Sequence, residues 1–197
     1  MLATWNYRMS RDAAAPLLFE AWAPILARSA NAARLSPDVA QVMGNRADYK
    51  QLEAFLAAPA GAVSAQIRDS LVLGALVEAV GDVTRRFGPD TTAWRWGTMH
   101  VAELRHPLAR AFDLPPVSRA GDANTVFATG GANYRQTAGA SYREVIDLGD
   151  FDNSVAINVP GQSAQPGSEY YDDLLPLWGS DKYFPLVFSR ARIEQET

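Results

Sequence analysis

The feature that most constrains this chain is a change of composition near Gly88 and Pro89. Before this point apolar residues recur at helical spacing, whereas after it glycine, proline, asparagine and aromatic residues become frequent and the apolar runs are short. Helices followed by strands are typical of an α+β fold and argue against an alternating βαβ chain. We therefore predict a helical segment over residues 1–89 and a strand-rich segment over residues 90–197.

The first segment predicts a series of helices that form a core. One lies within 17–30, and its apolar positions at helical spacing are Leu17, Leu18, Trp22, Ile25 and Leu26. Pro24 is expected near the start of that helix or at a kink in it. Another helix should begin after Ser36, because Pro37 then occupies the first helical position.

Two further helices are expected before the change of composition. The stretch 49–58 should end before Pro59, and a longer helix should run from Ser64 to Phe87, ended by glycine and proline. The apolar positions of the longer helix include Ile67, Leu71, Ala75 and Val77.

Short apolar runs between turn residues predict antiparallel strands in the second segment. The candidates are residues 124–130, 141–149 and 154–160, with a final extended stretch at 183–189. Residues 170–178 are expected to form a short helix or a turn. No repeat at a fixed period is visible, so a solenoid or a propeller is not expected.

Composition narrows the classes of function. The chain has 18 basic and 22 acidic residues, and this net charge of −4 disfavours a broad nucleic-acid surface. Because there is no cysteine, disulfides, thiolate metal sites and a cysteine nucleophile are excluded. No apolar run approaches the roughly 20 residues of a membrane helix, and residues 1–12 lack the pattern of a secretory signal. We therefore expect no nucleic-acid partner and no membrane partner.

The two histidines, His100 and His106, flank Glu103, which raises the possibility of a metal site. On a helix, however, six residues separate the two rings by about 120°, unlike the i, i+4 pairs of zinc motifs. Pro107 also disfavours helical geometry at the residue before it. We therefore expect two structural or hydrogen-bonding histidines and no metal ligands.

The sequence Gly161-Gln162-Ser163 resembles a hydrolase nucleophile elbow in which Gln165 replaces the second glycine. In that fold the acid and the histidine follow the serine, whereas both histidines of this chain precede Ser163. A turn after a strand is therefore the expected role. Phosphate-binding loops of the Walker and G-x-G-x-x-G types do not occur.

Acidic residues also lie near expected turns, in the stretches 121–124 and 169–173. Asp172 and Asp173 are neighbours in sequence, so their side chains do not face each other on a helix or a strand. We expect turn and capping roles for both stretches rather than an acid–base pair.

Several motifs occur in a fixed order along the chain. They are Trp-Gly-x-x-His with His-Pro-Leu within 94–112, Gly-Asp-x-x-Thr at 121–125, Ser-Tyr-Arg at 141–143, Gly-Gln-Ser at 161–163 and Tyr…Trp…Tyr-x-Pro-Leu within 170–190. This order resembles the C-terminal part of the penicillin amidase (penicillin acylase) family, and residues 2–22 are similar to a helical stretch of that family that begins Leu-x-x-Trp-Asp. The resemblance covers nearly the whole chain. Asn6 and Ala164 stand where the family usually has aspartate and glycine.

The resemblance implies an αββα sandwich of the N-terminal nucleophile hydrolases. In that superfamily a precursor cuts itself to expose a serine whose α-amine activates its own hydroxyl, and an asparagine contributes to the oxyanion hole. The resemblance places these groups, and the family's calcium ligands, upstream of this segment. We therefore expect no catalytic, cofactor-binding or metal-ligating residue here. Met1 and Leu2 offer no nucleophile, and cleavage before Thr98, Ser168 or Ser180 would sever the matching motifs.

Two functions stay open at this point. The first is the C-terminal part of a hydrolase of linear amides (acyl amides, β-lactam side chains or acyl-homoserine lactones), whose partner is the missing upstream part. The second is a stand-alone, non-catalytic α+β binding module. A fragment should expose strand edges and an apolar face that a self-contained module lacks, and the candidates are 124–130 and 154–160. The resemblance implies exported relatives but leaves the location of this chain open.

Overall fold

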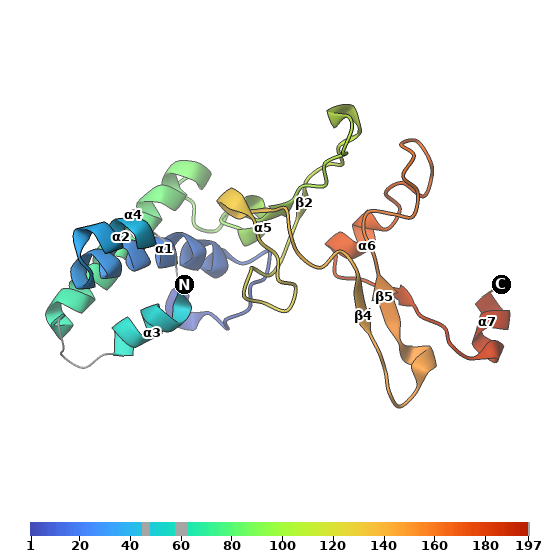
Figure 1. Cartoon of the computed structure of the whole chain (residues 1–197), viewed down its shortest axis with the longest axis horizontal. Coiled ribbons are helices and arrows are strands. Elements are labelled where there is room, and N and C mark those ends of the chain that lie inside the picture. The colour runs from blue at the N-terminus through green and yellow to red at the C-terminus, as the bar shows by residue number, and fades with distance from the viewer. Residues whose placement is uncertain (45–47, 58–62, 197) are drawn as a thin grey trace. The chain divides into compact units, whose positions relative to one another are not determined.

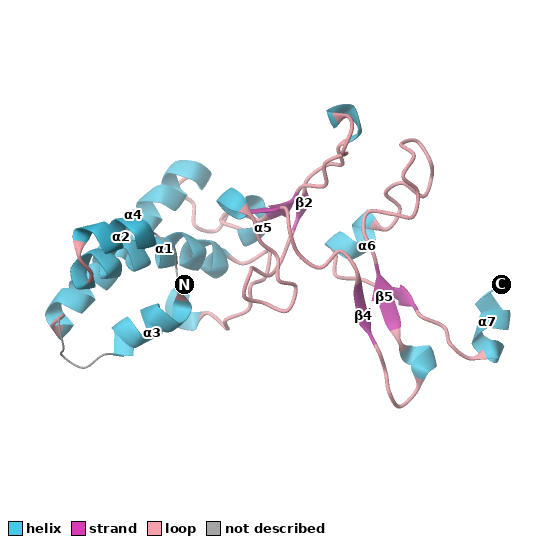
Figure 2. Ribbon diagram, viewed as in Figure 1, coloured by secondary structure: helices cyan, strands magenta, loops and turns pink. Residues whose placement is uncertain are grey.

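A computed structural model describes residues 1–44, 48–57 and 63–196. The chain forms two compact units (Figure 1). Unit 1 comprises residues 1–8 and 12–96, and unit 2 comprises residues 9–11 and 97–197. Helices build the first unit, whereas short strands joined by long loops build the second (Figure 2), so the fold class is α+β, as predicted.

Unit 1 is organised around one long central helix. Its helices are α1 (Ala14–Arg34), α2 (Pro37–Met43), α3 (Tyr49–Ala57) and α4 (Ala65–Phe87), preceded by the short 3-10 helix η1 (Leu2–Thr4). The other helices all contact α1, and α4 lies along it. Leu17 and Leu26 are fully buried, and Leu18 and Ile25 nearly so, which confirms the predicted apolar stripe.

The helix ends of unit 1 follow the predicted signals. Ser36 precedes α2 with Pro37 in its first turn, and the Ser64 hydroxyl accepts a hydrogen bond from Ile67 N at the start of α4. Gly88 ends α4 at a φ of 84°, which glycine adopts most readily. Pro24 lies inside α1 rather than near its start.

Two details depart from the simplest reading of the helical pattern. α3 ends at Ala57 as its bounds are described, and Pro59, the predicted stop signal, lies outside the described residues. On α4 the buried residues are Ala75, Ala79 and Val83, whereas Ile67 and Val77 face the surface.

Unit 2 contains two small sheets. The first has the order β2-β1-β3, formed by β1 (Val101–Ala102), β2 (Val117–Ser118) and β3 (Arg135–Gln136). The second has the order β4-β5-β6, formed by β4 (Arg143–Val145), β5 (Val155–Ile157) and β6 (Phe184–Pro185). The pairing of β1 with β3 is parallel, which departs from the antiparallel prediction, and the other strand pairs of these two sheets are antiparallel.

Short helices complete unit 2. They are α5 (Trp96–Met99), whose first residue belongs to unit 1, α6 (Leu175–Gly179), which overlaps the predicted helix-or-turn stretch 170–178, α7 (Arg190–Glu196) and the 3-10 turns η2 (Arg110–Phe112), η3 (Ala132–Tyr134) and η4 (Phe151–Asn153). One core joins the two sheets, because Ala102 of β1 and Ile157 of β5 pack with Leu175 and Trp178 of α6.

The strand prediction for residues 124–130 is wrong. Asp122 curls this segment into turns: its carboxylate accepts a hydrogen bond from Asn124 N at 2.8 Å, and its carbonyl accepts one from Thr129 N at 2.9 Å. Such local bonds to aspartate offer the backbone an alternative to a sheet ladder. Val126 is 98% exposed on these turns.

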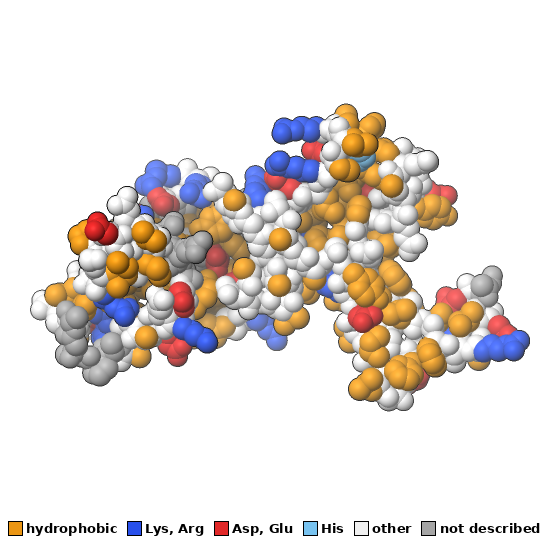
Figure 3. Space-filling model, viewed as in Figure 1, with side chains coloured by type: hydrophobic (Ala, Val, Ile, Leu, Met, Phe, Trp, Pro, Cys, Tyr) orange, Lys and Arg blue, Asp and Glu red, His pale blue; other side chains and the backbone are white. Residues whose placement is uncertain are grey.

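The prediction that 154–160 is an exposed edge is also wrong, since β5 is the central strand of its sheet. Among the described residues, β4 pairs only with β5, so its other edge is open. Hydrophobic side chains gather over the β4–β5 hairpin (Figure 3). The exposed ones there are Tyr142, Val145, Ile146, Leu148 and Phe151.

Candidate functional site

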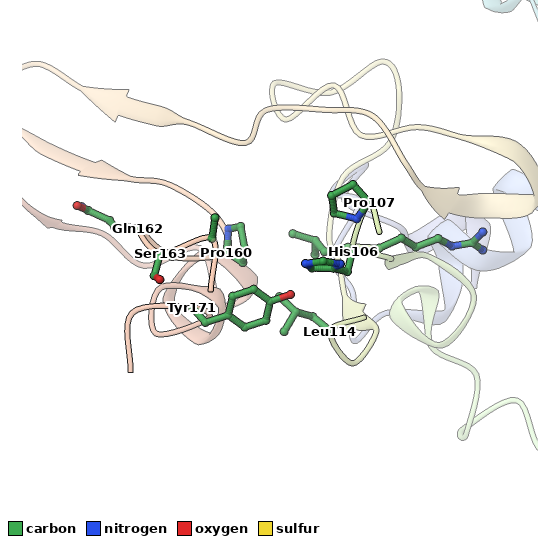
Figure 4. A pocket seen from close by; sticks show the side chains of 11 residues that line it. His106, Pro107, Leu114, Pro160, Gln162, Ser163 and Tyr171 are labelled. Atoms are coloured by element: carbon green, nitrogen blue, oxygen red, sulfur yellow. The ribbon is translucent and has the colours of Figure 1, made fainter. Parts of the chain in front are cut away.

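A pocket of about 530 Å³ in unit 2 collects most of the side chains that the sequence singled out (Figure 4). One wall follows β1, and the facing wall is the turn after β5. The lining residues are Leu104, Arg105, His106, Pro107, Leu114, Pro160, Gly161, Gln162, Ser163, Ala164 and Tyr171. The pocket thus brings Ser163 and His106 to one place, although they are 57 positions apart in the sequence.

His106 is fixed in a tautomer that donates rather than accepts toward the pocket. Its Nδ1 accepts hydrogen bonds from the backbone N–H groups of Leu108 and Ala109, each at 3.2 Å. In the neutral ring the proton then sits on Nε2. Its own backbone N–H donates to the Asp113 carboxylate at 2.8 Å, and the Phe112 ring packs edge-on at 5.4 Å. A ring held in this way cannot take a proton from a serine through Nε2.

Ser163 is part of a tight turn. Its backbone N–H donates to the Tyr170 carbonyl at 2.8 Å, and its hydroxyl oxygen accepts from Gln165 N at 3.1 Å. Gly161 allows the close approach, because a Cβ there would collide with the Tyr170 carbonyl and the Asp173 carboxylate. In Figure 4 the Ser163 hydroxyl points away from His106. Gly-Gln-Ser therefore acts here as a turn.

Two other polar side chains of the pocket already have partners. The Tyr171 hydroxyl donates to the Phe112 carbonyl at 2.8 Å, and Arg105 pairs with Glu103 at 3.0 Å. Among the described lining residues, Ser163 lacks a base positioned to activate it. The pocket therefore offers apolar walls with a few hydrogen-bond donors, which suits binding better than acyl transfer. That the chain holds no catalytic residue stays a prediction.

His100 and Glu103, which were considered as metal ligands, interact with different protein groups. His100 is 2% exposed, and its Nδ1 lies 3.2 Å from the Arg119 carbonyl, to which it donates. Glu103 pairs with Arg105 and, at 3.2 Å, with Arg135. Within the part of the chain that the structure describes, no three His, Asp or Glu side chains gather into a metal-ligating group.

The environment of His100 favours its neutral form. Burial of the ring is the main cause that lowers the pKa of His100 below 6.5, and the nearby Arg119 guanidinium adds to it. The hydrogen bond to the Arg119 carbonyl and the Asp122 carboxylate act in the opposite direction. His100 is thus a buried hydrogen-bonding histidine.

A second polar centre of unit 2 was not expected from the sequence, and we call it the arginine–tryptophan node: Arg119, Arg143, Trp178 and Asp181. Both guanidiniums donate to the Trp178 carbonyl, at 2.7 and 2.8 Å, and both pair with the Asp181 carboxylate at 3.0 Å. The Arg119 guanidinium also lies over the Trp178 ring, 4.1 Å from its centroid.

The node is buried and charged. Arg119 is 1% exposed and Arg143 is 9% exposed. Burial lowers the pKa of the Arg119 guanidinium below its usual range, while the Asp181 carboxylate acts against that shift. Asp181 reaches both arginines from a left-handed backbone conformation with a φ of 57°. The node joins the loop after β2, strand β4 and the end of α6, so it holds unit 2 together rather than presenting groups to a ligand.

The other candidates of the sequence lie in turns and at helix ends. Asp172 and Asp173 are exposed before α6, where the Asp172 carbonyl accepts from Leu175 N at 3.0 Å. Thr98 is exposed within α5, and Ser168 forms a turn with Gln165. None of the helices in the described parts of the chain is both long and apolar enough to cross a membrane.

The fold and this geometry define an α+β chain whose motif residues build turns and a buried node. Comparison with known proteins is specific: the profile of the penicillin amidase family matches residues 1–195. Because this match spans nearly the whole sequence, the chain belongs to the penicillin amidase family. The family implies the N-terminal nucleophile superfamily.

Curated relatives carry two kinds of name. The chain is 36% identical over 132 residues to penicillin acylase 2 proenzyme of Pseudomonas sp. (strain SE83), which covers 62% of this chain and 16% of that protein. It is 29% identical over 108 residues to acyl-homoserine lactone acylase QuiP of Pseudomonas putida, covering 51% of this chain and 13% of the relative. It is 23% identical over 149 residues to QuiP of Pseudomonas aeruginosa, covering 65% of this chain and 18% of that relative. The chain spans about a sixth of the length of these relatives.

Proposed function

We propose that this chain is the C-terminal portion of an amidase-like hydrolase that cleaves the carbon–nitrogen bond of linear acyl amides. The observation that carries the proposal is the family match over residues 1–195, combined with a span of only 13–18% of the relatives' length. In the complete enzyme, water adds across the amide and releases an acyl acid and an amine.

The role proposed for these residues is to support a site whose nucleophile lies upstream. The pocket geometry supports this, because Ser163 lacks an activating base among the described lining residues and His106 presents a donor there. The open edge of β4 and the exposed apolar hairpin also support it, since a chain complete in itself usually covers such surfaces. Any calcium that the family implies would be held upstream.

The substrate class follows the names of the relatives. Penicillin acylase and acyl-homoserine lactone acylase both name the removal or transfer of an acyl group, so an N-acyl amide is the shared chemistry that we propose for this family member. We propose that the residues that select the acyl group and the amine lie upstream, together with the nucleophile.

A chimera tests the proposal. The segment of the Pseudomonas sp. proenzyme that this chain matches is replaced by the chain's own residues, and hydrolysis of chromogenic phenylacetyl and long-chain acyl amides is measured. We expect activity within about tenfold of the parent, and Ser163→Ala in the chimera should leave it unchanged. A matched chimera with Arg119→Met should lose activity through misfolding of unit 2. If the intact chimera folds and is inactive, the stand-alone binding module becomes the better account.

A further inference from the structure

The surface-facing side of α4 is unusual for an exposed helix. Residues 66, 70, 73, 77, 80 and 84 recur at steps of four and three and therefore form one stripe. The stripe carries no charged residue, and its large side chains are exposed: Leu73 by 62%, Val77 by 74% and Val80 by 38%. The opposite side of α4 is buried in unit 1. Between Leu73 and Val80 the helix is therefore apolar on both sides, and such a helix is covered on both sides in its working state.

Two glycines beside the stripe make the same point independently. Gly74 and Gly81 lie inside α4, where glycine is less favourable than alanine. Neither is required by described neighbours: a Cβ at Gly74 would meet nothing within 4 Å, and one at Gly81 would meet only the Arg85 guanidinium at 3.5 Å. Glycines seven residues apart lie nearly on one line along the helix and let another backbone approach closely.

We propose that this face, defined by Leu73, Gly74, Val77, Val80 and Gly81, is the docking surface for an apolar helix of the upstream polypeptide of the hydrolase. The inference rests on the proposed function. The length of chain outside these residues supports this occupant, because the matched segment is only 13–16% of the length of the relatives. A helix suits the face, since the stripe offers side-chain ridges and a glycine groove but no free backbone donors for a strand.

The absence of cysteine makes the face directly measurable, because Val77→Cys then carries the only thiol of the chain. Maleimide labelling is compared between the purified chain and a complex of the chain with the upstream portion of the Pseudomonas sp. relative, whose formation is scored by copurification and by amide hydrolysis. Val77→Cys should react freely in the chain alone and at least tenfold more slowly in the complex. Arg86→Cys, which is exposed near the C-terminal end of α4 and half a turn around the helix from Val77, is the matched control and should react equally in both.

Gly74→Ala provides a second readout with opposite signs. In the chain alone it should raise the midpoint of thermal unfolding by about 2–4 °C, because alanine favours the helix and has free space. In the complex it should raise the dissociation constant for the upstream portion at least tenfold, because the added methyl group separates the two helices.

The outcomes separate the two proposals. An active complex in which Val77→Cys labels as fast as in the chain alone overturns the docking surface and leaves the proposed function standing. Failure to form any complex or activity overturns the proposed function, and the occupant with it. Slow labelling of Val77→Cys in the chain alone overturns the docking surface too, and its dependence on concentration then identifies a second copy as the occupant.

Discussion

Different kinds of interaction stabilise the interiors of the two units. Unit 1 buries leucine, isoleucine and alanine side chains between α1 and its neighbours, and its polar groups lie mostly at the surface. Unit 2 has strands of two or three residues, and near its centre two buried arginines bind one backbone carbonyl and one carboxylate. The first unit therefore depends on the hydrophobic effect, whereas the second depends on satisfying buried polar groups.

The two units also differ in how far apart in the sequence their stabilising residues lie. In unit 1 the buried residues of α1, α3 and α4 belong to helical patterns that short stretches of sequence encode. In unit 2 Arg119 reaches Trp178 across 59 positions, and Arg143 reaches Asp181 across 38. Four expected outcomes test this difference between the two units.

Loss of a node arginine should destabilise unit 2 alone. Arg119→Met removes one donor from the Trp178 carbonyl and one partner from Asp181, and we expect a loss of about 4 kcal/mol in the free energy of unfolding of unit 2. Trp178 is the tryptophan of that unit, so ¹⁹F NMR of fluorotryptophan during urea unfolding reports it separately. Arg105→Met, at an exposed ion pair, is the control and should cost under about 1 kcal/mol. A similar loss in the free energy of unfolding of unit 2 in both variants would show that the arginine–tryptophan node does not specially stabilise this unit.

Leu26→Ala should have the mirror effect on unit 1. Leu26 is fully buried in the core around α1, and its truncation should cost about 3 kcal/mol through lost burial and a cavity. Helix content followed by circular dichroism during unfolding measures this, with Leu73→Ala on the exposed face as a near-neutral control. A matching loss in the Trp178 signal would contradict the independence of the two units.

Mild acid should weaken unit 2 before unit 1. The pKa of His100 is lowered below 6.5 in the folded chain, mainly by burial, so the unfolded state binds more protons as the pH falls below 6.5. The stabilisation from the neutral ring is present above that pH and is lost progressively as the pH falls toward the folded pKa. Unit 1 contains no histidine. The unit 2 midpoint should therefore fall between pH 7.5 and 5.5, and His100→Gln should abolish that dependence.

The smallest effect is expected at the C-terminal helix. The Asp152 carboxylate accepts from Phe188 N and Ser189 N, each at 2.8 Å, ahead of α7. A hydrogen bond from the Ser189 side chain and these backbone bonds lower the pKa of Asp152 below 3.8, so their stabilisation is present above pH 3.8 and is lost as the pH falls through the lowered value. Asp152→Asn should speed amide exchange at residues 188–196 without moving either unfolding midpoint. A global shift would show that α7 supports the unit 2 core.

The fold of unit 1 could be predicted from the sequence because its determinants are local. The spacing of Leu17 and Leu26, the cap at Ser64 and the stop at Gly88 each operate within a few residues. α7 was not predicted, although its i, i+4 ion pairs Arg190–Glu194 and Arg192–Glu196 were a usable signal.

Unit 2 resisted prediction for the opposite reason. Residues 124–130 have strand-like composition, yet Asp122 binds their backbone into turns, and composition does not reveal which alternative is lower in free energy. Arg119 sits in a loop with no local sign that it is buried. The motif residues Arg143 and Trp178 were noticed through the family resemblance, and the structure shows that they belong to the node.

At the candidate site, too, the local roles could be predicted and the long-range arrangement could not. The sequence pattern identified Ser163 as a turn residue and correctly placed His100 and His106 in hydrogen-bonding roles. It did not indicate that Ser163 and His106 line one pocket, because that depends on how the turn after β5 lies against the segment after β1.

Amide hydrolysis is the direct test of whether the nucleophile lies upstream of this chain. It is measured with the purified chain, alone and after co-refolding with the upstream portion of a relative. The account predicts no turnover of a chromogenic phenylacetyl or long-chain acyl amide by the chain alone. It predicts turnover after complementation that survives Ser163→Ala. Turnover by the chain alone that disappears in Ser163→Ala or in His106→Ala would contradict it, because the nucleophile would then lie in this pocket.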